Sequence, residues 1–160
     1  MKLVIFAVVM GLFWIWGASS ANGQIERTIV PMHSTCSDVE RIVGMPTCKT
    51  SHEVYDLKTE KIIIEFSTHR CQTAYKKVWD IPIGTVISVV RILKNPFLLN
   101  QAGIDLKGCE LSKWMSDIPN SFTYACGNIG LSISVQNDLV HQLMYYPTPS
   151  DSTLICKKGC

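Results

Sequence analysis

The chain has 160 residues, of which 47% are apolar, and its formal net charge at pH 7 is +2. A chain of this length is expected to form one domain that can bury a hydrophobic core. The near-neutral charge excludes an extended basic face that displaces counterions from phosphates, so no nucleic acid is expected as a partner.

The first 23 residues have the pattern of a secretory signal peptide. One cation, Lys2, precedes the apolar run Leu3–Trp16, and small residues follow from Gly17 onward. This run is shorter than the roughly 20 residues that cross a bilayer. We therefore predict a cleaved leader at residues 1–23, one domain at residues 24–160, no membrane span after cleavage, and a secreted or periplasmic location.

Seven cysteines follow the leader, which in an oxidising compartment predicts disulfide bonds. They lack the C-x2-C pairs that are typical of zinc sites and of thiol redox enzymes, so no metal or redox centre is expected. The disulfide candidates are Cys36, Cys48, Cys71, Cys109, Cys126, Cys156 and Cys160. Three pairings fit the chain: Cys36 with Cys48, Cys109 with Cys126, and Cys71 with either Cys156 or Cys160. At least two bridges are expected, and the odd count leaves one cysteine over.

The first predicted element of the mature chain is a helix over Thr35–Val43. Ser34 and Thr35 are both good N-cap residues, and Asp38 places a carboxylate in the first turn, where it opposes the helix dipole. Gly44 is a suitable left-handed stop.

Two similar groups of strands make up most of the remaining chain. Tyr55 is followed seven residues later by an alternating run that begins at Ile62, and Tyr124 is followed at the same distance by one that begins at Leu131. Each group then reaches a further strand, over Thr85–Leu93 and over Asp138–Tyr146. Two β-β-β units in tandem predict one antiparallel sheet of about six strands, with one buried face and one wetter face.

Loops and short helices are expected to link these strands. Ser67–Ile83 is predicted as a long loop, and residues 136–138 as a tight hairpin turn. Short helices are predicted over Phe97–Ala102 and around Leu111–Met115. The predicted fold class is α+β: an antiparallel sheet with one main N-terminal helix and one or two short linking helices, stapled by disulfides.

Segments along nearly the whole mature chain resemble a family of small exported proteins from environmental bacteria. The similarity rests on His33–Gly44, Tyr55–Lys58, Ile62–Ser67, Trp79–Val86, Gly103–Leu106, Gly130–Ile133, Tyr146-Pro147 and Asp151–Cys156. That family is uncharacterised, so the resemblance implies export and this fold but no activity.

A remoter similarity concerns Thr35–Pro46 alone. This segment resembles the helix that opens a small sheet domain in the SmpA/OmlA-type outer-membrane assembly lipoproteins and in the β-lactamase inhibitor protein. Asp38-Val39 lies one residue nearer to Gly44-Met45-Pro46 than that pattern has it. Those proteins bind other proteins and catalyse nothing, so the resemblance implies a binding module.

No motif in the sequence indicates catalysis or a cofactor. His52 and Asp56 resemble the ends of a metal-binding H-E-x-x-H motif, but in a strand they lie about 13 Å apart, too far to share a metal. Ser34 beside His33 is better explained as a helix cap than as a nucleophile. No phosphate-binding loop or nucleophile elbow is present. We therefore expect no enzyme and no cofactor.

Surplus aromatic residues provide a candidate contact surface, with Trp79, Tyr145 and Tyr146 as the partner contacts. Core packing is the alternative for Trp79. The expected function is an exported, non-enzymatic module that binds a protein or cell-envelope partner through one face of its sheet. The alternative is a small secreted hydrolase or metal-dependent enzyme with an unrecognised site, which a concave pocket with converging polar groups would favour.

Overall fold

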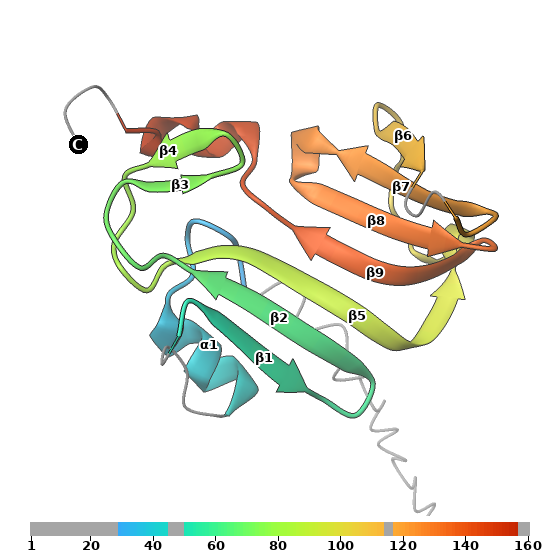
Figure 1. Cartoon of the computed structure of the whole chain (residues 1–160), viewed down its shortest axis with the longest axis horizontal. Coiled ribbons are helices and arrows are strands. Elements are labelled where there is room, and N and C mark those ends of the chain that lie inside the picture. Colours follow the sequence, from blue (N-terminus) through green and yellow to red (C-terminus); the bar gives the residue numbers. More distant parts are fainter. Residues whose placement is uncertain (1–28, 45–49, 114–116, 157–160) are drawn as a thin grey trace, which may run out of the picture.

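The computed structural model describes residues 29–44, 50–113 and 117–156, and antiparallel β-structure dominates them. The main sheet has seven strands in the order β1-β2-β5-β9-β8-β7-β6, and β3 and β4 form a separate two-stranded sheet (Figure 1). The elements are α1 (Cys36–Val43), β1 (His52–Asp56), β2 (Glu60–Phe66), β3 (Gln72–Ala74), β4 (Lys77–Trp79), β5 (Val86–Leu98), β6 (Glu110–Lys113), β7 (Ser121–Cys126), β8 (Leu131–Gln136) and β9 (Leu139–Tyr145), with short 3-10 helices at Leu99–Gln101, Gly127–Ile129 and Pro149–Leu154. The predicted leader, residues 1–23, lies outside the described residues.

The two predicted groups of strands occupy the two halves of the main sheet. β1, β2 and β5 form one half, and β9, β8 and β7 form the other, so that the last strand of each group meets its counterpart at the centre. β6 adds an edge strand beside β7. The expectation of an antiparallel sheet is confirmed, but the fold is dominated by β-structure, with one α-helix of eight residues among the described parts.

The helix α1 follows the prediction closely, with Thr35 as its N-cap. The Thr35 hydroxyl accepts a hydrogen bond from the Asp38 amide, and the Asp38 carboxylate accepts one from the Thr35 amide at 2.9 Å. This bond from the Thr35 backbone holds the pKa of Asp38 below its ordinary value. Gly44 ends the helix at φ 74°, where its amide donates to the Glu40 carbonyl. Local capping residues therefore determine both ends.

The first predicted linking helix is wrong for its leading residues. Phe97 and Leu98 extend β5 and pair with Val140 and Leu139 of β9, and a 3-10 turn begins only at Leu99. Pro96 lies within the register shift that separates the two paired stretches of β5. Because proline cannot donate to a ladder, it interrupts this strand without ending it.

The second predicted linking helix and the predicted long loop are also strands in part. Glu110–Lys113 forms β6 and pairs with β7, where a helical turn was expected around Leu111–Met115. Ser67–Ile83 contains the β3–β4 hairpin. Short apolar runs fit either a helix or a strand, and here distant partner strands decide between them. The tight turn at residues 136–138 is confirmed, with positive φ at Asn137 and Asp138.

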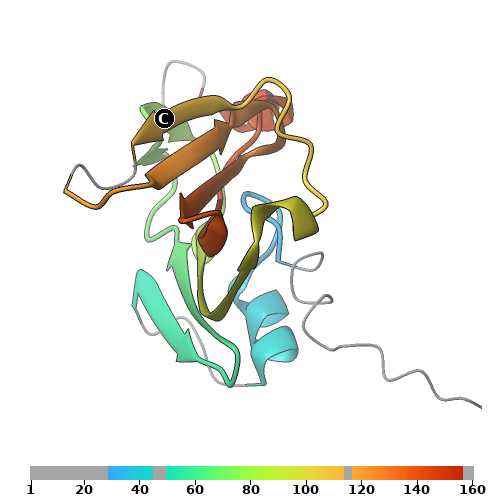
Figure 2. The same cartoon turned by 90° about the vertical axis from the view of Figure 1, so that its right-hand side faces the viewer.

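One face of the main sheet, called the inner face below, carries two hydrophobic clusters. The first packs under α1 and contains Ile29, Val39, Tyr55, Ile62, Ile64, Phe66, Val86 and Val89. The second contains Cys126, Leu131, Ile133, Val135, Val140 and Leu143 and packs against Leu99, Ile104 and Leu106 of the segment that follows β5. Figure 2 shows α1 and this covering segment, residues 99–109, on the same side of the sheet. Tyr145 packs against both clusters.

A third hydrophobic cluster joins the β3–β4 hairpin to the C-terminal 3-10 helix. It contains Met32, Trp79, Ile81 and Ile87, with Leu154 and Ile155 packed against it. Within the described ranges, no helix is both long and apolar enough to cross a membrane.

Candidate functional site: a cavity on the inner sheet face

A cavity of about 630 Å³ opens on the inner face, between the central strands and the covering segment. Its residues come from β2 and the turn before it, from β5, β8 and β9, and from residues 101–104. Its lining consists of Thr59, Glu60, Arg91, Leu93, Asn95, Phe97, Gln101, Ala102, Ile104, Leu131, Leu143 and Tyr145. The volume lies in the range of pockets that bind small molecules.

A buried ion pair between Glu60 and Arg91 contributes to the lining. Glu60 pairs with Leu93 across the β2–β5 ladder, and Arg91 lies one inward-facing position before Leu93 on β5. Arg91 Nε donates to Glu60 Oε2 at 2.6 Å, and Nη2 donates to Oε1 at 3.1 Å. The side chains are 6% and 3% exposed. This two-point, charge-assisted arrangement fixes both side chains in the sheet.

Burying this ion pair lowers the free energy gained on folding, because the rest of this face of the sheet is apolar. Removing two charges from water costs several kcal/mol per ion, and apolar residues of similar volume often stabilise a protein as well or better. Glu60 shares the inward alternation of Ile62 and Ile64, and Arg91 shares that of Val89. A structural role alone therefore gives little reason for charges at these two positions. Both side chains line the inner-face cavity.

The remaining lining divides into apolar walls and an exposed polar edge. The walls are formed by Leu93, Phe97, Ile104, Leu131, Leu143 and Tyr145, whereas Asn95 and Gln101 are exposed to solvent. Among the described residues that line the cavity, Glu60 is the one acid, Arg91 is the one base, and none is a serine, cysteine or histidine. The arrangement can hold an amphipathic group, and Thr59 and Tyr145 add hydroxyl groups to the lining.

Sequence reasoning missed Glu60 and Arg91. The available signal was a charged residue at an inward position of an alternating strand: Glu60 in step with Ile62 and Ile64, and Arg91 in step with Val89. Taken separately in the sequence, Glu60 and Arg91 each resemble a solvent-exposed residue near the end of a strand. Only the register between β2 and β5 shows that the two charges meet.

Trp79 is a core residue, so its proposed role as a partner contact is wrong. It is 1% exposed, and its indole Nε1 donates to the Ala74 carbonyl at 2.9 Å. Lys77 covers the ring, with Nζ 5.6 Å from its centroid. Trp79 is packed in the core, which was the alternative considered for it.

Tyr145 and Tyr146 both line a smaller cavity of about 260 Å³, but their other contacts differ. Tyr145 lines the inner-face cavity. Tyr146 stacks on Tyr75 of the β3–β4 turn with ring centroids 5.5 Å apart, and its hydroxyl donates to the Leu131 carbonyl at 3.3 Å. Burial raises the pKa of both Tyr75 and Tyr146. Of the three predicted contacts, Tyr145 alone belongs to the inner-face cavity.

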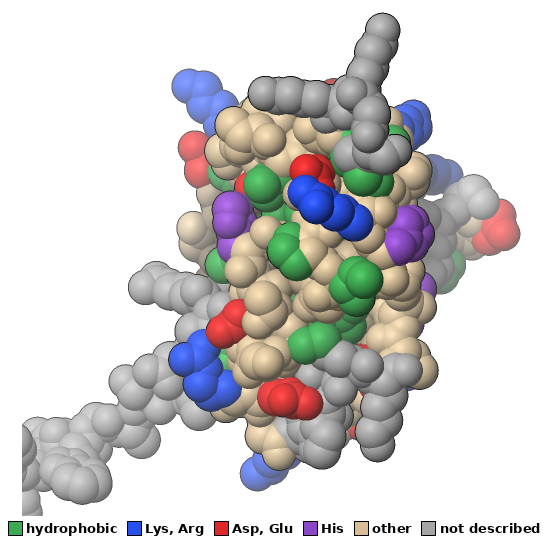
Figure 3. All heavy atoms as spheres, turned by 90° about the vertical axis from the view of Figure 1, so that its left-hand side faces the viewer, with side chains coloured by type: hydrophobic (Ala, Val, Ile, Leu, Met, Phe, Trp, Pro, Cys, Tyr) green, Lys and Arg blue, Asp and Glu red, His purple; other side chains and the backbone are tan. Residues whose placement is uncertain are grey.

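The end of the molecule that carries α1 and the β3–β4 hairpin offers no continuous apolar surface in view. Figure 3 shows its described apolar side chains in small groups, separated by polar and charged atoms. Scattered apolar side chains are ordinary on a protein surface, so this view adds no second candidate site.

The predicted Cys109–Cys126 disulfide is confirmed. Its Cα atoms are 4.2 Å apart, and it joins the start of the edge strand β6 to the end of β7. The predicted partners Cys48 and Cys160 lie outside the described residues. Cys36 is disulfide-bonded.

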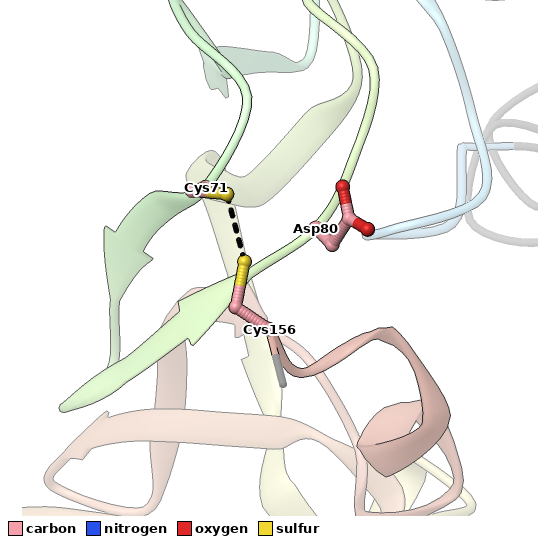
Figure 4. A group of neighbouring side chains, drawn as sticks. All are labelled: Cys71, Asp80 and Cys156. Atoms are coloured by element: carbon pink, nitrogen blue, oxygen red, sulfur yellow. Dashed lines mark hydrogen bonds between the residues drawn. The ribbon is translucent and has the colours of Figure 1, made fainter. Parts of the chain in front are cut away.

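Cys71, Asp80 and Cys156 converge where the β3–β4 hairpin meets the C-terminal segment (Figure 4). The two Sγ atoms are 2.9 Å apart, and all three ligand atoms lie within 4.8 Å of one another. Both cysteines are disulfide-bonded, whereas a metal would require thiolates. The Asp80 carboxylate is paired with Arg70, which lowers the pKa of Asp80. Both sulfurs are therefore committed to disulfides, and the pairing of Cys71 with Cys156 or Cys160 stays a prediction.

A second polar pair, His33 and Asp151, lies beside a smaller cavity of about 260 Å³. His33 Nε2 and Asp151 Oδ1 are 2.7 Å apart, and Asp151 Oδ2 accepts hydrogen bonds from the Thr148 amide and hydroxyl. Burial raises the pKa of Asp151, but these bonds outweigh it and hold the pKa below its ordinary value. A histidine oriented by a carboxylate provides two of the three members of a catalytic triad.

Compared with known proteins, the chain matches no family model, no curated protein and no solved structure.

Proposed function

We propose that the protein is a non-enzymatic binding module whose ligand site is the inner-face cavity. The observation that carries this proposal is the Glu60–Arg91 pair, which is more than nine-tenths buried and lines a cavity with largely apolar walls. Apolar walls supply affinity, and a few placed polar groups supply specificity. Tyr145 is the predicted contact residue that the proposal retains.

The ligand is an amphipathic component of the cell envelope or of a partner molecule. The apolar walls suit a hydrocarbon or aromatic group of the ligand. The exposed Asn95 and Gln101 form a polar edge at the opening of the cavity. The sequence of Thr35–Pro46 resembles a segment of protein-binding modules. This resemblance is a prediction that no comparison tests, and it supports a binding function.

We also propose that the protein works outside the cytoplasm. The pattern of residues 1–23 supports export, and the Cys109–Cys126 disulfide is compatible with an oxidising compartment. N-terminal sequencing of the protein from its native source tests this step. A chain that begins at Asn22 or Gln24 is expected, and an intact Met1 would contradict it.

The binding proposal is tested with N-phenyl-1-naphthylamine, an uncharged fluorophore that brightens in apolar surroundings. Ala102 is half-buried, lines the cavity and has ordinary helical backbone angles, so Ala102→Trp is expected to fill the cavity without backbone strain. Val54, which is 54% exposed on β1, supplies the control Val54→Trp. Wild type and the control should bind the probe, and Ala102→Trp should lose at least tenfold in affinity.

Equal binding by all three proteins would show that the probe does not use this cavity. No saturable binding by the wild type would contradict the proposed function itself. Thermal denaturation of each variant shows that the comparison is made between folded proteins.

A second candidate function is a secreted hydrolase, and the His33–Asp151 pair is the observation that favours it. Hydrolysis of 4-nitrophenyl acetate by the wild type, with at least a hundredfold loss in His33→Ala, would support that function. A rate that His33→Ala leaves unchanged would remove this pair as its basis.

A further inference from the structure

We propose that the inner-face cavity selects uncharged single-chain amphiphiles, with a neutral hydrogen-bonding head group beside Glu60 and Arg91, over fatty acids and alkyl amines. This inference rests on the proposed function and names the chemical class of its ligand. A monoacylglycerol is the type of molecule that fits, with its glycerol at the ion pair and its chain along the apolar walls.

The first argument is the charge of the cavity. Glu60 and Arg91 neutralise each other through two hydrogen bonds, and the other residues of the lining carry no formal charge at pH 7. Lys94, next to the lining residues Leu93 and Asn95, is itself paired with Asp56 and donates to the Leu57 carbonyl. A charged head group that entered here would lose its hydration without gaining a counter-ion.

The second argument is the hydrogen-bonding capacity of the lining. A carboxylate can accept about four hydrogen bonds, and Arg91 provides two of those received by Glu60. A hydroxyl or amide can therefore donate to Glu60, whereas an ionised fatty acid has no proton to donate and is repelled by it. The amides of Asn95 and Gln101 both donate and accept, which suits the same neutral groups.

The third argument is the size and lining of the walls. Six apolar side chains, Leu93, Phe97, Ile104, Leu131, Leu143 and Tyr145, surround a volume of about 630 Å³. Burial of each methylene strengthens binding by up to about fourfold. Affinity is therefore expected to rise with chain length until the cavity is full and then to level off.

The experiment measures displacement of N-phenyl-1-naphthylamine from the mature wild-type protein by three ligands with the same ten-carbon chain. These are 1-decanoylglycerol, decanoate and decylammonium, each used below the concentration at which it forms micelles. The neutral ester should displace the probe at a concentration at least tenfold lower than either ion. Displacement by decanoate or decylammonium at an equal or lower concentration would overturn the selectivity while leaving the proposed function intact.

Failure of the proposed function looks different, because then neither the probe nor any of the three ligands binds saturably. Two variants test the role of the ion pair. Glu60→Gln leaves a net positive charge at Arg91 and should shift the preference towards decanoate by at least tenfold. The double variant E60Q/R91Q is neutral and should retain the preference for the ester.

If Glu60→Gln fails to fold because it buries an uncompensated charge, the double variant carries the test. A preference of E60Q/R91Q for decanoate would overturn the inference. Unchanged selectivity in a folded Glu60→Gln protein would overturn it as well, because the charge of the pair would then have no effect on the ligand.

Discussion

His33 Nε2 lies 2.7 Å from Asp151 Oδ1, although the two residues are 118 positions apart in the sequence. This contact joins the segment before α1 to the C-terminal 3-10 helix. The same carboxylate caps that helix by accepting from the amide and hydroxyl of Thr148. One aspartate therefore connects the two ends of the described chain, and its ionisation state affects both contacts.

This geometry predicts a loss of stability in acid. The pKa of Asp151 is lowered in the folded protein from an ordinary value of 3.8, so its contribution is fully present above about pH 4 and is lost as the pH falls through the folded value. Asp151→Asn should cost about 1 to 2 kcal/mol of unfolding free energy at pH 7. Urea denaturation from pH 7 to pH 2 measures the difference from wild type, which should shrink below pH 4. A difference that stays constant over this range would contradict the assignment.

The Glu60–Arg91 pair predicts a strong asymmetry between single and double substitutions. Arg91→Leu leaves a buried carboxylate without its counter-ion and should lower the unfolding free energy by about 3 to 5 kcal/mol. Glu60→Leu combined with Arg91→Leu removes both charges and should cost much less, or nothing. The measurement is chemical denaturation of wild type, Glu60→Leu, Arg91→Leu and the double variant. A double variant as unstable as the sum of its single variants would show that the two side chains do not act as a pair.

The Cys109–Cys126 bridge is expected to stabilise the edge of the sheet. It closes a loop with a sequence separation of 17, for which the chain-entropy model gives about 3 kcal/mol. Replacing both cysteines by alanine should lower the unfolding free energy by about this amount and expose the β6–β7 amides to hydrogen exchange first. Exchange that accelerates equally in β1 and β2 would indicate a global effect instead.

Gly130 and Gly103 provide a matched pair for separating backbone strain from steric conflict. Both have positive φ, at 63° and 64°, but a Cβ on Gly130 would lie 2.2 Å from the Tyr146 carbonyl oxygen, whereas nothing lies within 4 Å of one on Gly103. Gly103→Ala should cost about 1 to 2 kcal/mol from the left-handed conformation alone. Gly130→Ala should cost at least about 1 kcal/mol more. Equal losses in thermal denaturation would contradict the close approach at Gly130.

The sequence was informative wherever bonding is local. Thr35, Asp38 and Gly44 determine the limits of α1 because a capping box and a left-handed stop need only residues within a few positions. Alternation predicted the strands that contain Tyr55 and Tyr124 and the two groups to which they belong. The pairing of Cys109 with Cys126 could likewise be predicted, since the two cysteines are close in the sequence. In the structure they lie at adjoining ends of β6 and β7, which pair with each other.

Tertiary structure decided what depends on partners far along the chain. Phe97 and Leu98 are strand residues because β9 offers them a ladder, although their local sequence fits a helix equally well. The burial of Trp79 depends on packing between the hairpin and the C-terminal segment.

The candidate site shows the same division. Leu131 and Tyr145 come from the second group of strands, and Glu60 and Arg91 come from the first, so the cavity exists only where β5 and β9 join the two groups. By itself, the sequence determined which faces are apolar and where the helix starts and stops. Only the register between β2 and β5 decided that a buried acid meets a buried base 31 positions away, because a shift of one residue would turn either side chain to the opposite face of the sheet.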